Sequence, residues 1–317
     1  MGAPTVDELR TAFCWEADDQ IPRRPEMTAF RREARYRQAQ WREANRHPIG
    51  TQPIVPKPGD ARVRSMGSRM PFEYARRAGA NFVTSAAFDA ALARTAYAEP
   101  HQSFDHRRLW ADLLSSAALS FNLFGDLAAD LALADRAVHR WFPDALGPVS
   151  ALRFAHSPGR LDPAFLNSLR AFASMFVLDR EDGTKGIVAV DVKYHERNKA
   201  ETPRPDNLAR YASVAKRSRT FAPGAIDALA RRGDLCVMWL EHLLLLSMLQ
   251  HASGTWTWGR YVVVHPTGNS DIADACARYR SMLGDDVTFA TTTLEQLLDT
   301  ETIPRTTVVG LRERYLT

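Results

Sequence analysis

The segment GIVAVDVKY, residues 186–194, constrains the fold most, because it is an apolar strand that ends in two charged residues. Successive side chains of a strand point to opposite faces of its sheet. Asp191 and Lys193 therefore share one face, and the valines around Asp191 point the other way. The pattern predicts a carboxylate beside an ammonium group at the end of a buried strand.

A second strand-like segment precedes this one. FASMFVLD, residues 172–179, is joined to it by REDGTK, whose Asp-Gly pair is a turn signal. We predict an antiparallel hairpin over residues 172–194. Further strand-like runs are VSALRFAH (149–156), RYVVVHP (260–266) and VTFATTT (287–293).

Helical periodicity surrounds these strands. Residues 103–142 predict two packed helices with a break near Gly125, and residues 235–252 predict a buried helix. Residues 1–100 differ, because they combine helical stretches with the Pro- and Gly-rich connector HPIGTQPIVPKPGD (47–60). We expect a helical and irregular N-terminal extension over 1–100 and an α/β domain over 101–317.

Composition narrows the class of protein. The 317 residues are 45% hydrophobic and carry a net charge of +4. The three cysteines lie far apart, which argues against a disulfide framework or a thiolate metal site. The longest apolar run, 235–249, is interrupted by Glu241 and His242 and is shorter than the roughly 20 residues a bilayer crossing needs. The start has no signal-peptide pattern, so we expect a cytoplasmic protein that does not cross a membrane.

The segment RREARYRQAQWREANR, residues 31–46, concentrates positive charge. Such a helix could contact nucleic-acid phosphates, or it could be a solvated amphipathic helix. Its candidate phosphate contacts are Arg31, Arg32, Arg35 and Arg37.

The order helix, three strands, helix, strand, together with VAVDVKYHE, resembles the PD-(D/E)XK nuclease superfamily. The blocks LLSSAALSFNLFGDL (113–127) and WLEHLLLLSML (239–249) resemble a poorly characterised bacterial branch of it. The resemblance covers about residues 105–316. It implies a restriction-endonuclease-like core, with a central mixed β-sheet flanked by helices, and a metal-dependent nuclease that acts on nucleic acid, with DNA favoured.

The resemblance also implies roles for individual residues. Asp191 and the backbone carbonyl of Val192 would bind Mg²⁺ or Mn²⁺, and Lys193 would orient the attacking water and the phosphate. Glu196 and Asp112 could be outer partners of the metal or its water, or ordinary solvated carboxylates. The simpler alternative for Asp191 and Lys193 is an exposed ion pair, worth about 0.2–1 kcal/mol.

The sequence departs from the family where a second metal-binding aspartate is expected. Counting outward from the turn puts Ser174 opposite Asp191, or Ala173 if the register slips by one residue, and the resemblance also points to Ala173. Asp179 lies roughly 16–20 Å away along the strand, too far to share an ion with Asp191. We therefore expect poor metal affinity and low or absent cleavage, through natural loss or an introduced substitution, and expect Ala173→Asp to restore both.

Three functions remain open from the sequence. The first is a metal-dependent nuclease or an inactivated copy of one, the second a noncatalytic nucleic-acid-binding protein, and the third a protein-interaction module. A nuclease predicts Mg²⁺-dependent cleavage, a binder predicts salt-sensitive retention of nucleic acid without cleavage, and an interaction module predicts neither.

Overall fold

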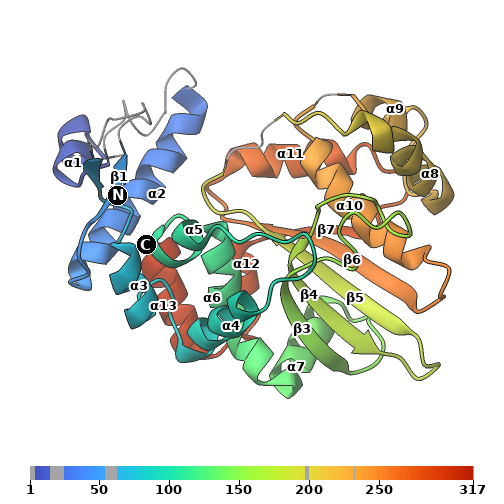
Figure 1. Ribbon diagram of the computed structural model, residues 1–317, viewed down its shortest axis with the longest axis horizontal. Helices are drawn as coiled ribbons and strands as arrows, with labels where there is room; N and C mark the ends of the chain where they lie inside the picture. Colours follow the sequence, from blue (N-terminus) through green and yellow to red (C-terminus); the bar gives the residue numbers. More distant parts are fainter. Residues whose placement is uncertain (1–3, 15–24, 54–62, 197–199, 232, 317) are drawn as a thin grey trace.

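A mixed sheet of five strands forms the centre of the molecule (Figure 1). The computed structural model describes residues 4–14, 25–53, 63–196, 200–231 and 233–316. The strand order is β3-β4-β5-β6-β7, in which the first three strands are antiparallel neighbours and the last two run parallel to β5. Since β5 is central, both of its faces are buried. The strands are β3 (Val149–His156), β4 (Phe172–Asp179), β5 (Lys185–Val192), β6 (Trp256–His265) and β7 (Phe289–Thr293).

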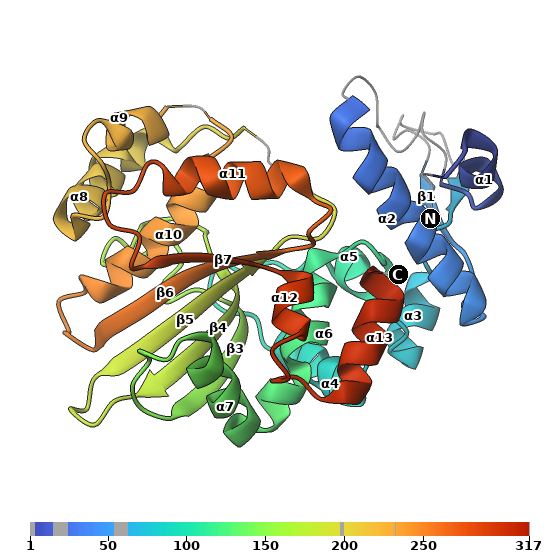
Figure 2. The ribbon, with the colours of Figure 1, turned by 180° about the vertical axis from the view of Figure 1, so that it is seen from behind.

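Helices cover both faces of this sheet (Figures 1 and 2), which confirms the predicted α/β class with a central mixed sheet. One face packs against α6 (Ser116–Ala129), α7 (Leu131–Trp141) and α12 (Leu294–Leu298). The other face packs against α8 (Leu208–Ser218), α9 (Ala225–Leu229), α10 (Cys236–Leu249) and α11 (Ser270–Arg280), and a 3₁₀ turn, η1 (Pro205–Asn207), precedes α8.

The predicted hairpin forms, but its register differs by one residue from the pairing of Ser174 with Asp191 that counting outward from the turn predicts. The amide of Arg180 donates to the carbonyl of Thr184 (2.9 Å), and Gly183 adopts a left-handed φ of 78° between them. Three residues therefore lie inside the turn instead of two, as in a hairpin whose type I turn is followed by a left-handed glycine. Ser174 consequently pairs with Val190 and not with Asp191.

The break expected near Gly125 is wrong, because α6 runs through that residue to Ala129. Gly125 is needed for close packing: a Cβ there would lie 2.4 Å from the Cα of Ala87 in α4 (Ser85–Ala96). The chain bends at Asp130, whose carboxylate caps the start of α7. Among the described residues no single helix is long and apolar enough to cross a membrane, and the one pair that qualifies together, α6 with α7, is bent by 116°.

The N-terminal hundred residues form helices and a small two-stranded sheet. Part of the connector predicted to be irregular, Gly50–Pro53, is strand β1 and pairs with β2 (Val63–Met66), while residues 54–62 lie outside the described residues. Phe82 belongs to the same apolar cluster as the sheet. The remaining helices are α1 (Val6–Thr11), α2 (Pro25–Ala44), α3 (Phe72–Ala78), α5 (His106–Ala111) and α13 (Arg305–Tyr315).

A buried arginine ties the N-terminal helices to the last helix. Arg314 of α13 has no exposed surface, and its guanidinium donates to the carbonyl of Asn81 (2.7 Å) and to the amide oxygen of Gln38 in α2 (3.2 Å). It also lies over the ring of Trp41 at 4.5 Å from its centroid. Helix α2 is therefore fixed against α13 by a fully enclosed cation.

Two matched glycine substitutions test the packing explanation for Gly125. Gly125→Ala should lower the free energy of unfolding by about 1–3 kcal/mol, because the added methyl group meets the backbone of α4. Gly310→Ala, in the middle of α13 with only an ordinary 3.7 Å contact to Val83, should raise it by about 0.4–1 kcal/mol. Denaturant unfolding measures both, and a stabilised Gly125→Ala protein would contradict the close approach of α4 and α6.

Candidate active site

Asp191 and Lys193 lie together at the end of β5, as the sequence predicts. The ammonium nitrogen of Lys193 is 2.8 Å from Oδ2 of Asp191, and the two side chains are 24% and 12% exposed. The amide of Lys193 donates to the carbonyl of Val264 (2.9 Å), so the pairing of β5 with β6 extends past the last residue of β5. The pair is thus held in a nearly enclosed position by the sheet itself.

A second carboxylate reaches this pair from helix α10. Glu241 is buried close to Asp191 and accepts a hydrogen bond from the hydroxyl of Tyr261 at 2.8 Å. Its other oxygen lies 3.9 Å from the guanidinium of Arg170, in the segment that leads into β4. Two carboxylates and two cations therefore converge on the face of the sheet that α10 covers.

The charged groups of this cluster shift one another's pKa values. Burial and the neighbouring Asp191 raise the pKa of Glu241 to about 8, although Lys193 and Arg170 oppose the shift. Burial alone would lower the pKa of Lys193, but the two carboxylates outweigh it and raise that pKa. At neutral pH Glu241 thus keeps its proton beside a charged lysine.

Arg170 links the cluster to the next segment of chain. Its guanidinium donates to the carboxylate of Glu201, and its side chain is 20% exposed. Burial tends to lower the pKa of Arg170, but Glu241 and Glu201 raise it overall. Arg170 is therefore a permanently charged group at the rim of the site.

The position at which the family carries its aspartate holds no acid. The pairing of β4 with β5 begins at Ser174, which lies opposite Val190, and Ala173 packs against the apolar cluster on the α6 face of the sheet. The hydroxyl of Ser174 lies 2.7 Å from that of Ser120 in α6, away from the α10 side of the sheet. Neither Ala173 nor Ser174 therefore brings a carboxylate to the end of β5.

Glu196 is fully engaged in holding the chain beyond β5. One carboxylate oxygen accepts from the amide of Tyr194 (2.8 Å) and the other from the guanidinium of Arg108 in α5 (2.6 Å). Burial opposes ionisation, but His195 and Arg108 lower the pKa of Glu196 to about 2. A carboxylate with these partners positions the strand end.

Asp112 follows α5 directly and lies in the connection to α6. One of its oxygens accepts from the amide of Leu114 (3.0 Å), and the other is 3.7 Å from the guanidinium of Arg69. Its contacts therefore fix local structure. His242, the neighbour of Glu241, is a hydrogen-bonded core residue, with ring nitrogens 2.9 Å from Tyr279 and from Thr288.

Helix α2 forms one wall beside the end of β5. The ring of Phe30 packs edge-on against Tyr194, and a Cβ on Gly268 would lie 2.8 Å from that ring. Burial lowers the pKa of the nearby His195 to about 4, and Arg35 and Arg31 add to the effect while Glu196 opposes it.

The four arginines predicted to contact phosphates occupy different settings on α2. Arg31 and Arg32 are half-buried, and Arg35 is buried. Arg37 instead donates to the carbonyl of Tyr315 at the end of α13 (3.0 Å). Arg31 and Arg35 form a basic wall near His195 beside the strand end, and Arg37 holds α2 to α13.

The arrangement matches a known class of fold and site. A hairpin ending in Asp-x-Lys, continued by a parallel strand and enclosed between α6 and α10, is consistent with the core of restriction-endonuclease-like nucleases. A family model of the PD-(D/E)XK nuclease superfamily matches residues 25–317, and the chain belongs to this superfamily. No curated protein and no solved structure matches the chain significantly. The matched region includes α2, which the sequence analysis assigned to an extension.

Sequence reasoning missed Glu241. Its signal was present, because it is the one acidic residue in the otherwise apolar run LCVMWLEHLLLLSML. A buried carboxylate in such a helix needs a partner, but the sequence does not show which face of α10 meets the end of β5. Only the crossing of α10 over the sheet identifies that partner as Asp191.

The proton that Glu241 keeps in the folded state predicts how the free energy of unfolding depends on pH. A carboxyl group whose pKa rises from 4.5 to about 8 on folding binds more protons in the folded state, so its contribution is lost as pH rises toward 8. In metal-free buffer the free energy of unfolding should fall between pH 5.5 and 7.5 by up to about 1.4 kcal/mol per pH unit from this group. Glu241→Gln, which imitates the protonated acid, should remove that slope. Denaturant unfolding at several pH values measures it, and the same pH dependence of the free energy of unfolding in both proteins would contradict the assignment.

Proposed function

We propose that this chain is a metal-dependent nuclease in which Glu241 replaces the aspartate missing from β4. The observation that carries the proposal is the convergence of buried Glu241, Asp191 and Lys193 at the end of β5, with the Lys193 ammonium 2.8 Å from Asp191 and Arg170 3.9 Å from Glu241. The PD-(D/E)XK chemistry uses two carboxylates and a lysine, and here the second carboxylate comes from a helix instead of a strand. Glu241 therefore supports an active chain, where the sequence alone suggested a loss of activity.

The donor groups present suit a hard divalent cation. Mg²⁺ commonly takes one or two protein carboxylates and completes its octahedron with water and substrate phosphate. Asp191 and Glu241 supply that number, and the carbonyl of Val192 is a third oxygen. The described residues contain no group of three or more His, Cys, Asp or Glu placed to hold a metal. Bound Mg²⁺ or Mn²⁺ would supply charge compensation at the phosphate and lower the pKa of water.

The two cations of the cluster have separate tasks in this proposal. Lys193 remains protonated beside Asp191, so its ammonium group can orient the water that attacks and donate to a phosphate oxygen. Arg170, at the rim, can bind a phosphoryl oxygen through a guanidinium that keeps its charge at any working pH. Both groups place positive charge where the transition state gathers negative charge.

The substrate we propose is nucleic acid, with DNA favoured by the family. Helix α2 stands beside the strand end through Phe30 and Tyr194, so a strand bound at Asp191 would pass the basic wall. We assign phosphate contacts to Arg31 and Arg32, and a supporting position beside His195 to Arg35. These contacts would guide the backbone without reading its sequence.

A metal-binding experiment tests the carboxylate pair apart from activity. Saturating Mn²⁺, at about 100 times its dissociation constant, should stabilise the wild-type chain against unfolding by about 2.7 kcal/mol. Asp191→Asn and Glu241→Gln should each lose most of this stabilisation, together with Mn²⁺-dependent cleavage of DNA. Lys193→Gln should keep or strengthen Mn²⁺ binding, because a competing cation is removed, yet lower cleavage at least about a hundredfold.

Two outcomes would contradict the proposal in different ways. If only Ala173→Asp confers Mn²⁺ binding and cleavage, the second carboxylate belongs on β4 and Glu241 is structural. If neither wild type nor Ala173→Asp cleaves DNA or RNA while nucleic-acid binding persists, the chain is a noncatalytic binder.

The basic wall predicts the salt dependence of binding. Replacing both Arg31 and Arg32 by glutamine should weaken DNA affinity. The slope of the logarithm of affinity against the logarithm of salt concentration should become about two units less negative, because two fewer phosphates are neutralised. The matched control replaces Arg76 and Arg77, two exposed arginines of α3, in the same way. Equal salt slopes for the two double variants would return α2 to the role of a structural helix.

A further inference from the structure

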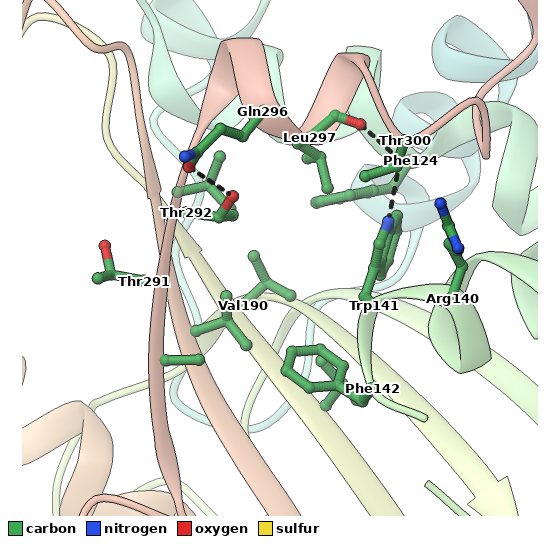
Figure 3. Close-up of a pocket in the computed structure, with 14 residues that line it drawn as sticks. Phe124, Arg140, Trp141, Phe142, Val190, Thr291, Thr292, Gln296, Leu297 and Thr300 are labelled. Carbon is green, nitrogen blue, oxygen red and sulfur yellow. Dashed lines mark hydrogen bonds between the residues drawn. The ribbon is translucent and has the colours of Figure 1, made fainter. Parts of the chain in front are cut away.

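The sheet face opposite the carboxylate cluster carries a cavity that the proposed nuclease chemistry does not use. It has a volume of about 340 Å³ and lies between α7, α12 and the sheet (Figure 3). Strands β5 and β6 supply four of the valines that line it, and α7 and the residue after it supply two aromatic rings. The lining side chains that the argument uses are Val188, Val190, Val262, Val264, Trp141 and Phe142.

The cavity is partly open to solvent, so a small molecule could enter it. An apolar void of about 150 Å³ already binds benzene. Small-molecule sites start near 300 Å³ and combine apolar walls with a few polar groups. The cavity therefore has the size and lining of a ligand site.

The polar groups of the cavity are largely satisfied by one another. The indole nitrogen of Trp141 donates to the hydroxyl of Thr300 (3.3 Å), and that hydroxyl donates to the carbonyl of Leu297 (2.7 Å). The hydroxyl of Thr292 donates to the side-chain oxygen of Gln296 (3.4 Å), as Figure 3 shows. These contacts leave little hydrogen-bonding capacity for a strongly polar ligand.

Arg140 supplies the remaining charge. It lines the cavity beside Trp141, is exposed, and has no ion-pair partner within the described residues. An apolar chamber with a cation at its edge complements a molecule that has an apolar body and one anionic group.

We propose that this cavity binds a small aromatic acid, with its ring system against the valines of β5 and β6 and its acidic group at Arg140. The proposal does not depend on the proposed nuclease function, because the cavity faces away from Asp191 and Glu241 and shares no side chain with them.

Two matched dyes test the site on the full chain. 1-Anilinonaphthalene-8-sulfonate and N-phenyl-1-naphthylamine have the same ring system, but only the first carries a negative charge. The folded wild type should bind each dye saturably at one site. Ala290→Leu, which fills the cavity from β7, should weaken both dyes at least tenfold without lowering the midpoint of thermal unfolding, because the added methyl groups occupy existing space. The control Ala132→Leu, on an exposed part of α7 outside the cavity, should leave both affinities unchanged.

A second pair of variants tests the acidic group. Arg140→Gln should weaken the sulfonate dye about tenfold and leave the uncharged dye unaffected. Arg136→Gln, one turn earlier on α7 and outside the cavity, should change neither. No saturable binding of either dye, or binding that survives Ala290→Leu, would overturn the site, and equal effects of Arg140→Gln on both dyes would overturn the assignment of an acidic ligand.

Discussion

The structure depends on an electrostatic constraint at the end of β5, where two carboxylates and a lysine are removed from water together. Leaving one buried charge without its partner costs about 3–5 kcal/mol, so Asp191, Lys193 and Glu241 must stay in contact. This requirement adds to the apolar packing that holds helix α10 against the sheet, and Tyr261 and Arg170 complete the polar contacts of Glu241. In the chemistry we propose, a metal ion would take the place of the proton on Glu241. The same carboxylates would therefore govern both the stability of the metal-free chain and its metal binding.

The N-terminal helices complete the site through a second buried charge. Arg314 holds α2 against α13, and α2 in turn places Phe30 and its arginines beside the chain that leaves β5. Glu196 anchors that same chain to α5. Helices α2, α5 and α10 thus all contact the end of β5 or the chain that leaves it. Strand β5 separates the carboxylate cluster on one face of the sheet from the apolar cavity on the other.

Much of the fold could be predicted from local pattern. The hairpin, the buried helix over 235–252 and the pairing of Asp191 with Lys193 follow from side-chain alternation and hydrophobic periodicity, which local sequence controls. The hairpin register and the helix break near Gly125 were predicted wrongly, because in each case a single glycine determines the local backbone geometry. A left-handed Gly183 moved the register of the hairpin by one position, and Gly125 reflects the nearness of α4, not the end of a helix.

The sequence by itself determined the family, the strand that carries Asp191 and Lys193, and the absence of an acid at positions 173 and 174. These properties depend on neighbours along the chain. Only the tertiary structure decided that Glu241, fifty residues further on, meets Asp191. The direction in which one side chain of an apolar helix points is set by how that helix crosses the sheet, and a helix that is apolar on all sides carries no periodic signal of that crossing.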